Sequence, residues 1–423
     1  MAKKRYILAG TGSRGLGMFG RPLTFDEELS AESEVVGLHD VSPARMDFVR
    51  RQLEKPEGFP CSTDFDELAG SLEFDGVIVA TKDAAHAGVI LKGLEYGKRV
   101  FCEKPVCVDE AQVRAILAAE AASEGDVLVT HNVRYSPGFS KVKEVIDDGL
   151  IGDLIFVEYN DYLDRHHGAD YFRRWHGVKA NSGGLAVHKA SHHYDILNYI
   201  VGSFGRTMFA TGGVSFYGKN GPFRGERCTG CAHADECEFH ADIFNHDITI
   251  GLYRDAEADS GYLRDGCVFR EEITTEDNYH SVFEYENGVR GVYTLVAYCP
   301  FEGHRIAFSG TRGRLEYTAI GSADWAPGTN ATPGLADTAG RSLRAFLPGE
   351  GIRDVEIPKV TGGHGGADPG LRHDFFIESW KSPERSPRMA SLMEGCQAVL
   401  LGAAANVSMA EGRVVDVQAL LEG

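Results

Sequence analysis

The chain has 423 residues, of which 43% are hydrophobic and 25% charged, a globular composition long enough for two or three domains. Its net charge of −19 disfavours a nucleic-acid-binding surface, which needs clustered lysines and arginines. No apolar run approaches the ~18 residues of a membrane span, and the first one breaks at Gly10, too early for a signal peptide. We therefore expect a cytoplasmic protein without nucleic-acid or membrane partners, in which the nine cysteines stay reduced.

The first strand and the turn that follows it predict a dinucleotide site. The apolar run Tyr6 to Ala9 leads into GTGSRG at residues 10–15, which is G-x-G-x-x-G directly after a strand. Such glycines permit a tight turn, close approach of the backbone to a pyrophosphate, and close packing of the next helix. The N-terminus of that helix offers N–H groups to phosphate. A plain glycine-rich turn is the competing interpretation, and the next elements argue against it.

Three more apolar segments, at residues 34–40, 75–81 and 99–105, alternate with helical stretches. This alternation predicts an α/β fold with a doubly wound parallel sheet. The first of these segments ends at Asp40, 30 residues after Gly10, where an acidic residue can accept hydrogen bonds from the adenosine ribose. Asp40 would repel a 2′-phosphate and so favours NAD, whereas Arg45 keeps NADP as an alternative. Lys104 lies near the end of the last segment, at the strand edge where open α/β sheets place ligands.

Several motifs, taken in order, resemble those of the Gfo/Idh/MocA oxidoreductases: AGTGSRG, VIVATKDAAH, FCEKP, HNVRYSP and SGGLAVHKASHHYDILNYIVG. The resemblance implies a Rossmann domain over residues 1–130. It implies a second α/β domain over 131–423, with a large, open, mainly antiparallel sheet that binds substrate and forms dimers or tetramers. It also implies cofactor contacts from Gly10, Gly12, Ser13, Arg14, Gly15, Asp40, Arg45, Thr81, His86, Glu103, Lys104 and Asn132.

The activity implied by the resemblance is hydride transfer between NAD(P) and a secondary alcohol of a sugar, inositol or glycoside. The stretch from 182 to 202, preceded by YFRRWHG, is most similar to a subgroup that oxidises sugar rings of glycosides, often at C3. Members carry Asp, then His four residues later, then Asp three residues later. The matching residues here are His188, His192 and Asp195, which this spacing places on one helix face.

The resemblance assigns the alcohol proton to His192 acting with Lys104. Alcohol oxidation needs a base within hydrogen-bond reach of the oxygen, and histidine titrates near neutral pH. His188 stands where Asp is common, so it could orient the substrate or share the proton. His188 and His192 also have zinc-ligand spacing, but Lys189 stands where the general base of H-E-x-x-H would be, and its charge disfavours a metal.

The predicted substrate contacts combine flat apolar faces with polar arms, as sugar sites require. For Arg173 a structural ion pair is the competing interpretation, and for His193 a buried, hydrogen-bonded histidine. The repeated apolar–polar alternation around residues 283–317 predicts antiparallel strands of the second domain. The candidate substrate residues are Arg134, Tyr162, Arg173, Trp175, His176, His188, His193, His364 and Asp368.

A cysteine-rich insertion near residues 220–245 contains Cys228, Cys231, Cys237 and His240. These four side chains could bind a structural zinc ion tetrahedrally or, less readily, an iron–sulfur cluster. The fourth ligand could instead be His233, and free thiols on an exposed loop are the competing interpretation. A closed four-ligand site would leave no open position for a substrate.

The sequence thus predicts an NAD-dependent dehydrogenase that acts on a sugar or glycoside and assembles as a homo-oligomer. One alternative is a glycosidase or lyase whose tightly bound NAD is recycled through a transient 3-keto sugar. Another is a dinucleotide-binding sensor or scaffold whose working part is the cysteine cluster. The presence of both Lys104 and His192 argues against this last one.

Overall fold

The computed structural model describes residues 2–321, 340–359, 363–382 and 384–422. Internal contacts divide the chain into two compact units. Unit 1 comprises Met1–Asn132, Ala241–Asp265 and Asp368–Val399; unit 2 comprises Val133–His240, Gly266–Ala367 and Leu400–Gly423. Two stretches that the sequence assigned to the second domain, 241–265 and 368–399, therefore pack with the first unit.

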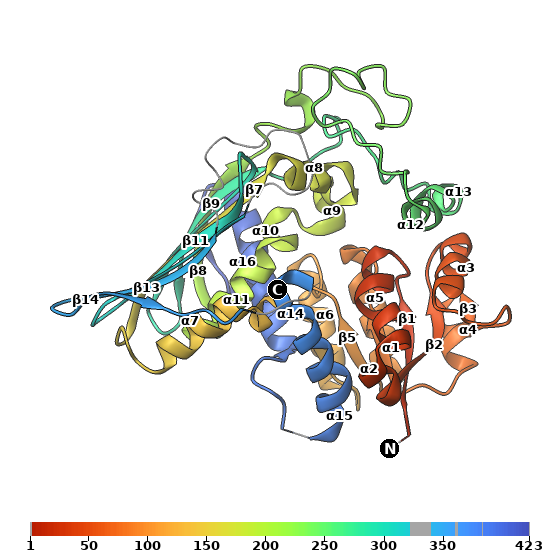
Figure 1. Cartoon of the computed structure of the whole chain (residues 1–423), viewed down its shortest axis with the longest axis horizontal. Helices are drawn as coiled ribbons and strands as arrows, with labels where there is room; N and C mark the ends of the chain where they lie inside the picture. Colours follow the sequence, from red (N-terminus) through yellow and green to blue (C-terminus); the bar gives the residue numbers. More distant parts are fainter. Residues whose placement is uncertain (1, 322–339, 360–362, 383, 423) are drawn as a thin grey trace. The chain divides into compact units, whose positions relative to one another are not determined.

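Unit 1 is built on a seven-stranded sheet in the order β15-β6-β5-β4-β1-β2-β3 (Figure 1). All neighbours in this sheet are parallel except β15, which runs antiparallel to β6. The order 3-2-1-4-5-6 is that of a dinucleotide-binding Rossmann sheet, whose ligand crevice lies where the order reverses. The strands are β1 Lys4–Ala9, β2 Ser33–His39, β3 Cys61–Ser62, β4 Gly76–Val79, β5 Arg99–Cys102, β6 Val127–Val129 and β15 Ala390–Ser391.

The central strands of unit 1 are apolar on both faces, which is why they form a covered parallel sheet. Tyr6 to Ala9 of β1 and Val77 to Val79 of β4 are fully buried. The connecting helices begin at polar caps, because Asp26, Ser42, Asp64 and Asp109 accept backbone N–H groups of the first turns. The helical segments are η1 Gly15–Gly20, α1 Arg21–Phe25, α2 Glu27–Glu32, α3 Pro43–Gln52, α4 Phe65–Gly70, α5 Asp83–Glu95 and α6 Glu110–Ala121.

Aromatic packing explains why residues 368–399 belong to unit 1. The Phe376 ring lies 5.4 Å from that of Tyr6 and 5.1 Å from that of Phe101. The Trp380 indole also donates a hydrogen bond to the Tyr6 hydroxyl over 2.7 Å. The helical segments of this stretch are α14 Gly363–His373, η7 Asp374–Glu378, α15 Ser379–Lys381 and the first part of α16 Leu392–Glu411.

Residues 241–265 lie against α3 through short helices α12 Asp247–Thr249, η5 Ile250–Arg254 and α13 Glu257–Ser260 (Figure 1). Gly251 packs so closely that a Cβ there would stand 2.1 Å from the Phe48 ring. Asp259 accepts hydrogen bonds from the Ser42 hydroxyl and the Ala44 amide at the start of α3. We call residues 241–265 the covering segment.

Unit 2 carries a nine-stranded sheet in the order β14-β13-β12-β11-β7-β10-β9-β8-β16. It is antiparallel except for β7 and β10, which confirms the predicted α/β architecture with a large, mainly antiparallel second sheet. The strands are β7 Leu154–Asp164, β8 Gly205–Gly213, β9 Asn278–Tyr285, β10 Arg290–Cys299, β11 Glu302–Gly310, β12 Arg314–Gly321, β13 Gly340–Leu347, β14 Gly351–Val355 and β16 Val415–Asp416.

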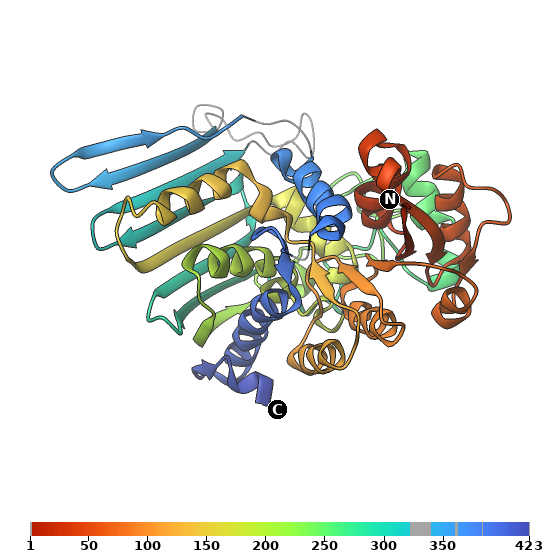
Figure 2. The same ribbon diagram turned by 90° about the horizontal axis from the view of Figure 1, so that it is seen from below.

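Alternating burial along β9 and β10 gives this sheet one covered face. Helices α7 and α11 lie along that face (Figure 2). No helix within the described residues is long and apolar enough to cross a membrane. The helical segments are η2 Asn132–Tyr135, α7 Pro137–Asp147, α8 Arg165–Arg173, η3 Trp175–Gly177, α9 Lys179–Ser182, α10 Leu185–His188, α11 Ala190–Val201, η4 Gly218–Asn220, the later part of α16, and α17 Ala419–Glu422.

Candidate active site

The glycine-rich turn after β1 has the shape that a pyrophosphate requires. Gly10 has φ +92°, and a Cβ there would stand 2.3 Å from the Ala80 carbonyl carbon; a Cβ on Gly15 would stand 2.0 Å from the Gly10 oxygen. Both positions therefore exclude any larger residue. At Gly12 the nearest atom to an added Cβ is 4.0 Å away, so the backbone there is open to a ligand. The residues present fit a bound dinucleotide.

Side chains from distant parts of unit 1 hold the rest of this turn. The Ser13 amide donates to the Tyr253 hydroxyl over 3.2 Å, which brings the covering segment onto the phosphate-binding turn. Arg14 Nε donates to Glu103 Oε1 over 2.7 Å, linking the turn to the end of β5. Sequence reasoning missed Tyr253, since nothing in its local sequence marks it as a partner of the turn.

Asp40 is buried at the end of β2 and surrounded by donors. Its Oδ2 accepts the amide and hydroxyl of Thr11 at 2.7 and 2.9 Å, and its Oδ1 accepts the Ser42 amide and Arg45 Nη1 at 3.0 and 2.8 Å. Arg45 is also held by the Leu252 carbonyl over 2.8 Å. Of these donors, the Thr11 hydroxyl is the one that can rotate aside for a ribose hydroxyl.

The carboxyl ends of β4 and β5 bring together further predicted residues. Lys104 is half-buried, and its backbone amide donates to Glu103 Oε2 over 3.2 Å. His86 is buried with its ring nitrogens 2.8 Å from the Pro105 oxygen and 3.2 Å from the Thr81 oxygen, so it joins the two strand ends. Burial lowers the pKa of His86, and its bonds to the two carbonyls oppose that shift.

Asn132 and Asp368 also lie together in unit 1. The Asn132 amide donates to Asp368 Oδ1 over 2.9 Å, and both side chains are buried. Asp368, predicted as a substrate contact, thus fixes the orientation of a predicted cofactor contact. His364 lies in α14, but its side chain is outside the described residues.

In unit 2, Arg134 and Asp195 form a fully buried ion pair. Arg134 Nε and Nη2 donate to the two Asp195 carboxylate oxygens over 2.8 and 2.6 Å, and neither side chain is exposed. The Arg134 guanidinium also lies 4.7 Å from the centre of the Tyr199 ring. This geometry gives Arg134 a structural role in supporting α11, and the substrate contact that the sequence suggests for it stays a prediction.

Three of the predicted substrate residues gather beside α10. The rings of Trp175 and His176 stack with centres 3.6 Å apart, and His188 meets His176 edge-on at 4.2 Å. Tyr171 packs 5.5 Å from His188. Trp175 is half-exposed whereas His176 and His188 are buried, so the cluster presents one flat aromatic face.

Three charged residues form a group that sequence reasoning missed. Asp161 lies on β7, Glu302 on β11, and Lys189 between α10 and α11. Burial raises the pKa of Asp161 to about 7, while nearby Lys189 lowers it and Glu302 raises it. Burial alone would lower the pKa of Lys189, but Tyr171, Asp161 and Glu302 together raise it. Glu302 also accepts from His167 over 2.9 Å. An acidic residue at a buried position of an alternating strand was the signal that could have revealed Asp161.

The two histidines of α11 differ in their surroundings. His193 is buried, stacks on Tyr159 with centres 4.6 Å apart, and bonds the Tyr293 hydroxyl over 2.7 Å. It lies 3.7 Å from Asp161, as expected for a satisfied buried histidine. His192 is half-buried, and its amide donates to the Lys189 carbonyl.

Two predicted substrate residues, Tyr162 and Arg173, lie apart from the Trp175, His176 and His188 cluster. Tyr162 follows Asp161 along β7, so its side chain points to the opposite face of the sheet, where it meets Phe301 at 5.2 Å between ring centres. Arg173 is buried and donates to the Phe239 carbonyl in the cysteine-rich loop.

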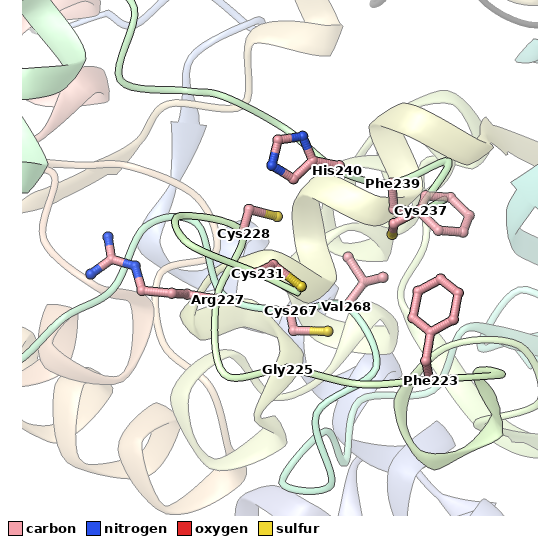
Figure 3. A pocket seen from close by; sticks show the side chains of 10 residues that line it. All are labelled: Phe223, Gly225, Arg227, Cys228, Cys231, Cys237, Phe239, His240, Cys267 and Val268. Atoms are coloured by element: carbon pink, nitrogen blue, oxygen red, sulfur yellow. The ribbon is translucent and has the colours of Figure 1, made fainter. Parts of the chain in front are cut away.

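As their side chains stand, no group of three or more His, Cys, Asp or Glu within the described residues is close enough to hold a metal ion. This holds for His188 and His192 and for the cysteine-rich loop. The cysteines of that loop nevertheless share one small cavity (Figure 3).

Two family models match the chain. One, for the oxidoreductase family's NAD-binding Rossmann fold (GFO_IDH_MocA), covers residues 5–131, and the other, for that family's C-terminal alpha/beta domain, covers residues 143–417. The chain is 31% identical over 99% of both lengths to the putative oxidoreductase YteT of Bacillus subtilis (strain 168). It is 26% identical to an inositol 2-dehydrogenase of Rhizobium meliloti (strain 1021), over 48% of this chain and 58% of that protein.

Among solved structures, a levoglucosan dehydrogenase in complex with NADH and levoglucosan has a TM-score of 0.68 and 18% identity, covering 98% of this chain and 99% of that one. An oxidoreductase from Agrobacterium radiobacter, in complex with NAD+, L-tartaric acid and magnesium, has a TM-score of 0.66 and 16% identity over 99% and 100%. At these identities the two structures share the fold with this chain.

Proposed function

The chain belongs to the Gfo/Idh/MocA family of NAD-binding oxidoreductases, and from this premise we propose that it oxidises a secondary hydroxyl of a sugar or glycoside with NAD. The main support for NAD as the cofactor is the position of Asp40 beside the open glycine turn of unit 1. The cluster of Trp175, His176 and His188 in unit 2 supports a carbohydrate as the substrate. So do the names of relatives, an inositol 2-dehydrogenase and a levoglucosan dehydrogenase. C3 is the ring position that we propose to examine first.

The surroundings of Asp40 favour NAD over NADP. A 2′-phosphate would meet the Asp40 carboxylate. The nearby Arg45 guanidinium is already bonded to Asp40 and to the Leu252 carbonyl. Bound NAD would supply the hydride acceptor at its nicotinamide ring. Gly10 to Gly15 would hold its pyrophosphate, and Asp40 its ribose hydroxyls.

We assign the alcohol proton to Lys104 and His192. As the C–H hydrogen leaves with two electrons, the O–H proton must pass to a base, leaving a ketone, NADH and one proton. Lys104 follows the end of β5 by two residues. The Glu103 side chain accepts the Lys104 backbone amide, and Arg14 in turn donates to Glu103. His192 stands in the first turn of α11. The proposal requires both side chains to reach the same hydroxyl in the working enzyme.

Trp175 is the proposed platform for the sugar ring. Its indole is half-exposed and supported from behind by His176, so it offers a flat apolar face to sugar C–H groups. His188, edge-on to both rings, would place a polar arm next to that face.

The test is NADH absorbance during incubation with NAD and a panel of sugars, inositols and glycosides. Lys104→Ala and His192→Ala should each lower kcat by about 100-fold or more while NAD still binds. Lys98→Ala, before the opposite end of β5, and His280→Ala, exposed on β9, are the matched controls and should keep full activity. Equal turnover in all four variants would contradict the assignment.

A second reaction is distinguished by the same incubation. Release of the aglycone with no net NADH would indicate that a bound cofactor is recycled through a 3-keto sugar. We place this reaction second because relatives named above are dehydrogenases. Assembly as a homodimer or homotetramer is part of the proposal, and sedimentation equilibrium tests it.

A further inference from the structure

The cysteine-rich loop has very little regular structure of its own. Residues 221–246, all of them described, contain no helix or strand apart from a single bridge between Arg227 and Gly266. A small group of rings, Phe223, Phe239 and Phe269, packs at centre distances of 5.7 to 6.2 Å. A loop with so small a core needs another source of stability, such as a metal or a disulfide.

A fourth cysteine, which the spacing did not reveal, joins the three of the loop. Cys267 follows the covering segment, and its amide donates to the Glu226 carbonyl over 3.0 Å. With the Arg227–Gly266 bridge, this contact places Cys267 next to Cys228. None of the four cysteines is in a disulfide.

The four thiols line one small cavity together with His240 (Figure 3). Their sulfur atoms face the same space, whereas the Arg227 guanidinium points away from it. The cavity measures about 20 Å³, which is room for one water-sized sphere and too little for a cluster of several iron and sulfur atoms. Its size therefore favours a single ion.

Backbone amides already point at the sulfurs. The His233 amide donates to Cys231 Sγ and the Phe269 amide to Cys267 Sγ, each over 3.4 Å. A backbone hydrogen bond joins Phe239 to the Cys237 thiol in the same way. In all three the donor is two residues after the cysteine. Such bonds orient sulfur ligands and stabilise their anionic form.

We propose that Cys228, Cys231, Cys237 and Cys267 bind one zinc ion, with His240 outside the coordination shell. Cys267 is preferred because a backbone amide orients its sulfur, whereas His240 is exposed at the rim. The sulfurs would need to close in on the ion to about 2.3 Å by side-chain rotation. Four protein ligands leave no open position, so the zinc ion is structural.

The site also brackets the covering segment along the chain. Residues 241–265 begin directly after His240 and end two residues before Cys267. A metal held by Cys237 and Cys267 would therefore fix the two ends of the segment that carries Tyr253. We expect zinc removal to expose residues 241–265 to protease.

The decisive measurement is the metal content of the full-length protein, purified under reducing conditions, reconstituted with Zn²⁺ and passed through a chelating column. Wild type, His240→Ala and the control Cys299→Ser should each keep about one zinc per chain. Cys267→Ser should lose it or bind it at least about tenfold more weakly in a chelator competition. Zinc kept by Cys267→Ser and lost by His240→Ala would overturn the ligand assignment, and a wild type without zinc would overturn the site.

X-ray absorption at the zinc edge tests the proposal even if Cys267→Ser does not fold. Four sulfurs at about 2.3 Å are expected in the wild type. Three sulfurs with one nitrogen at about 2.0–2.1 Å would return His240 or His233 to the site and refute the role of Cys267.

Discussion

Removing the Arg134 guanidinium should destabilise unit 2 far more than it weakens substrate binding. Arg134 and Asp195 share two hydrogen bonds of 2.8 and 2.6 Å, and neither side chain has any exposed surface. Arg134→Ala would leave the Asp195 carboxylate buried without its counter-charge.

Breaking a buried pair on one side typically costs about 3–5 kcal/mol. For a unit of this size, each kcal/mol lowers the melting temperature by roughly 2–4 °C, so the expected fall is about 6–20 °C. The double variant Arg134→Leu/Asp195→Leu removes both charges and should recover at least half of the loss, because apolar replacement of a buried pair is often close to neutral. The loss should change little with salt, since buried charges are poorly screened.

Differential scanning calorimetry of the wild type, both single variants and the double variant provides the measurement. Substrate kinetics below the lowered melting temperature provide the comparison. If Arg134→Ala melted with the wild type and raised only the substrate KM, Arg134 would be the substrate arm that the sequence suggested, and the structural argument would be wrong.

Three further outcomes follow from the described contacts. Asp40→Ala frees the Arg45 guanidinium and removes a carboxylate that repels the 2′-phosphate. The ratio of kcat/KM for NADP to kcat/KM for NAD should therefore rise at least about tenfold, or 1.4 kcal/mol. An unchanged ratio would refute this account of cofactor selectivity. Gly12→Val adds a side chain where the structure has open space, so the melting temperature should stay the same. The affinity for NAD, measured by calorimetry, should fall about 100-fold. Unaltered affinity would argue against a pyrophosphate at the glycine turn. Burial raises the pKa of Asp161 from 3.8 to about 7. The folded state therefore binds a proton that the unfolded state loses above about pH 4, and this contribution to stability falls by about 1.4 kcal/mol per pH unit as the pH rises to 7. Asp161→Asn should therefore lose less stability than the wild type between pH 5 and 7 in urea unfolding, and parallel curves would contradict the shift.

Local sequence was enough to predict the first sheet and the turn. Strands that are buried on both faces appear in the sequence as continuous apolar runs. The steric demands at Gly10 and Gly15 appear as glycines of a short motif. The antiparallel strands of unit 2 could be predicted because their alternation reports one covered face.

The contacts that decide individual roles could not be predicted in this way. Tyr253 meets Ser13 across 240 positions of sequence, and Arg134 meets Asp195 across 61. No spacing rule reaches so far, because the fold alone brings these residues together. The same holds for Cys267, which is separated from the other three cysteines by the whole covering segment.

The interleaving of the two units along the chain sets the order in which the protein can mature during synthesis. The first 132 residues hold six of the seven strands of their sheet, but β15 arrives only at Ala390–Ser391, and the Phe376 and Trp380 rings that pack on Tyr6 come just before it. A nascent chain released from the ribosome before that point would carry an open sheet edge and an uncovered aromatic surface, both of which favour aggregation. Truncated or prematurely terminated chains of this protein should therefore be substrates for chaperones or proteases, and the Rossmann half cannot be expressed as one contiguous fragment without losing part of its own core.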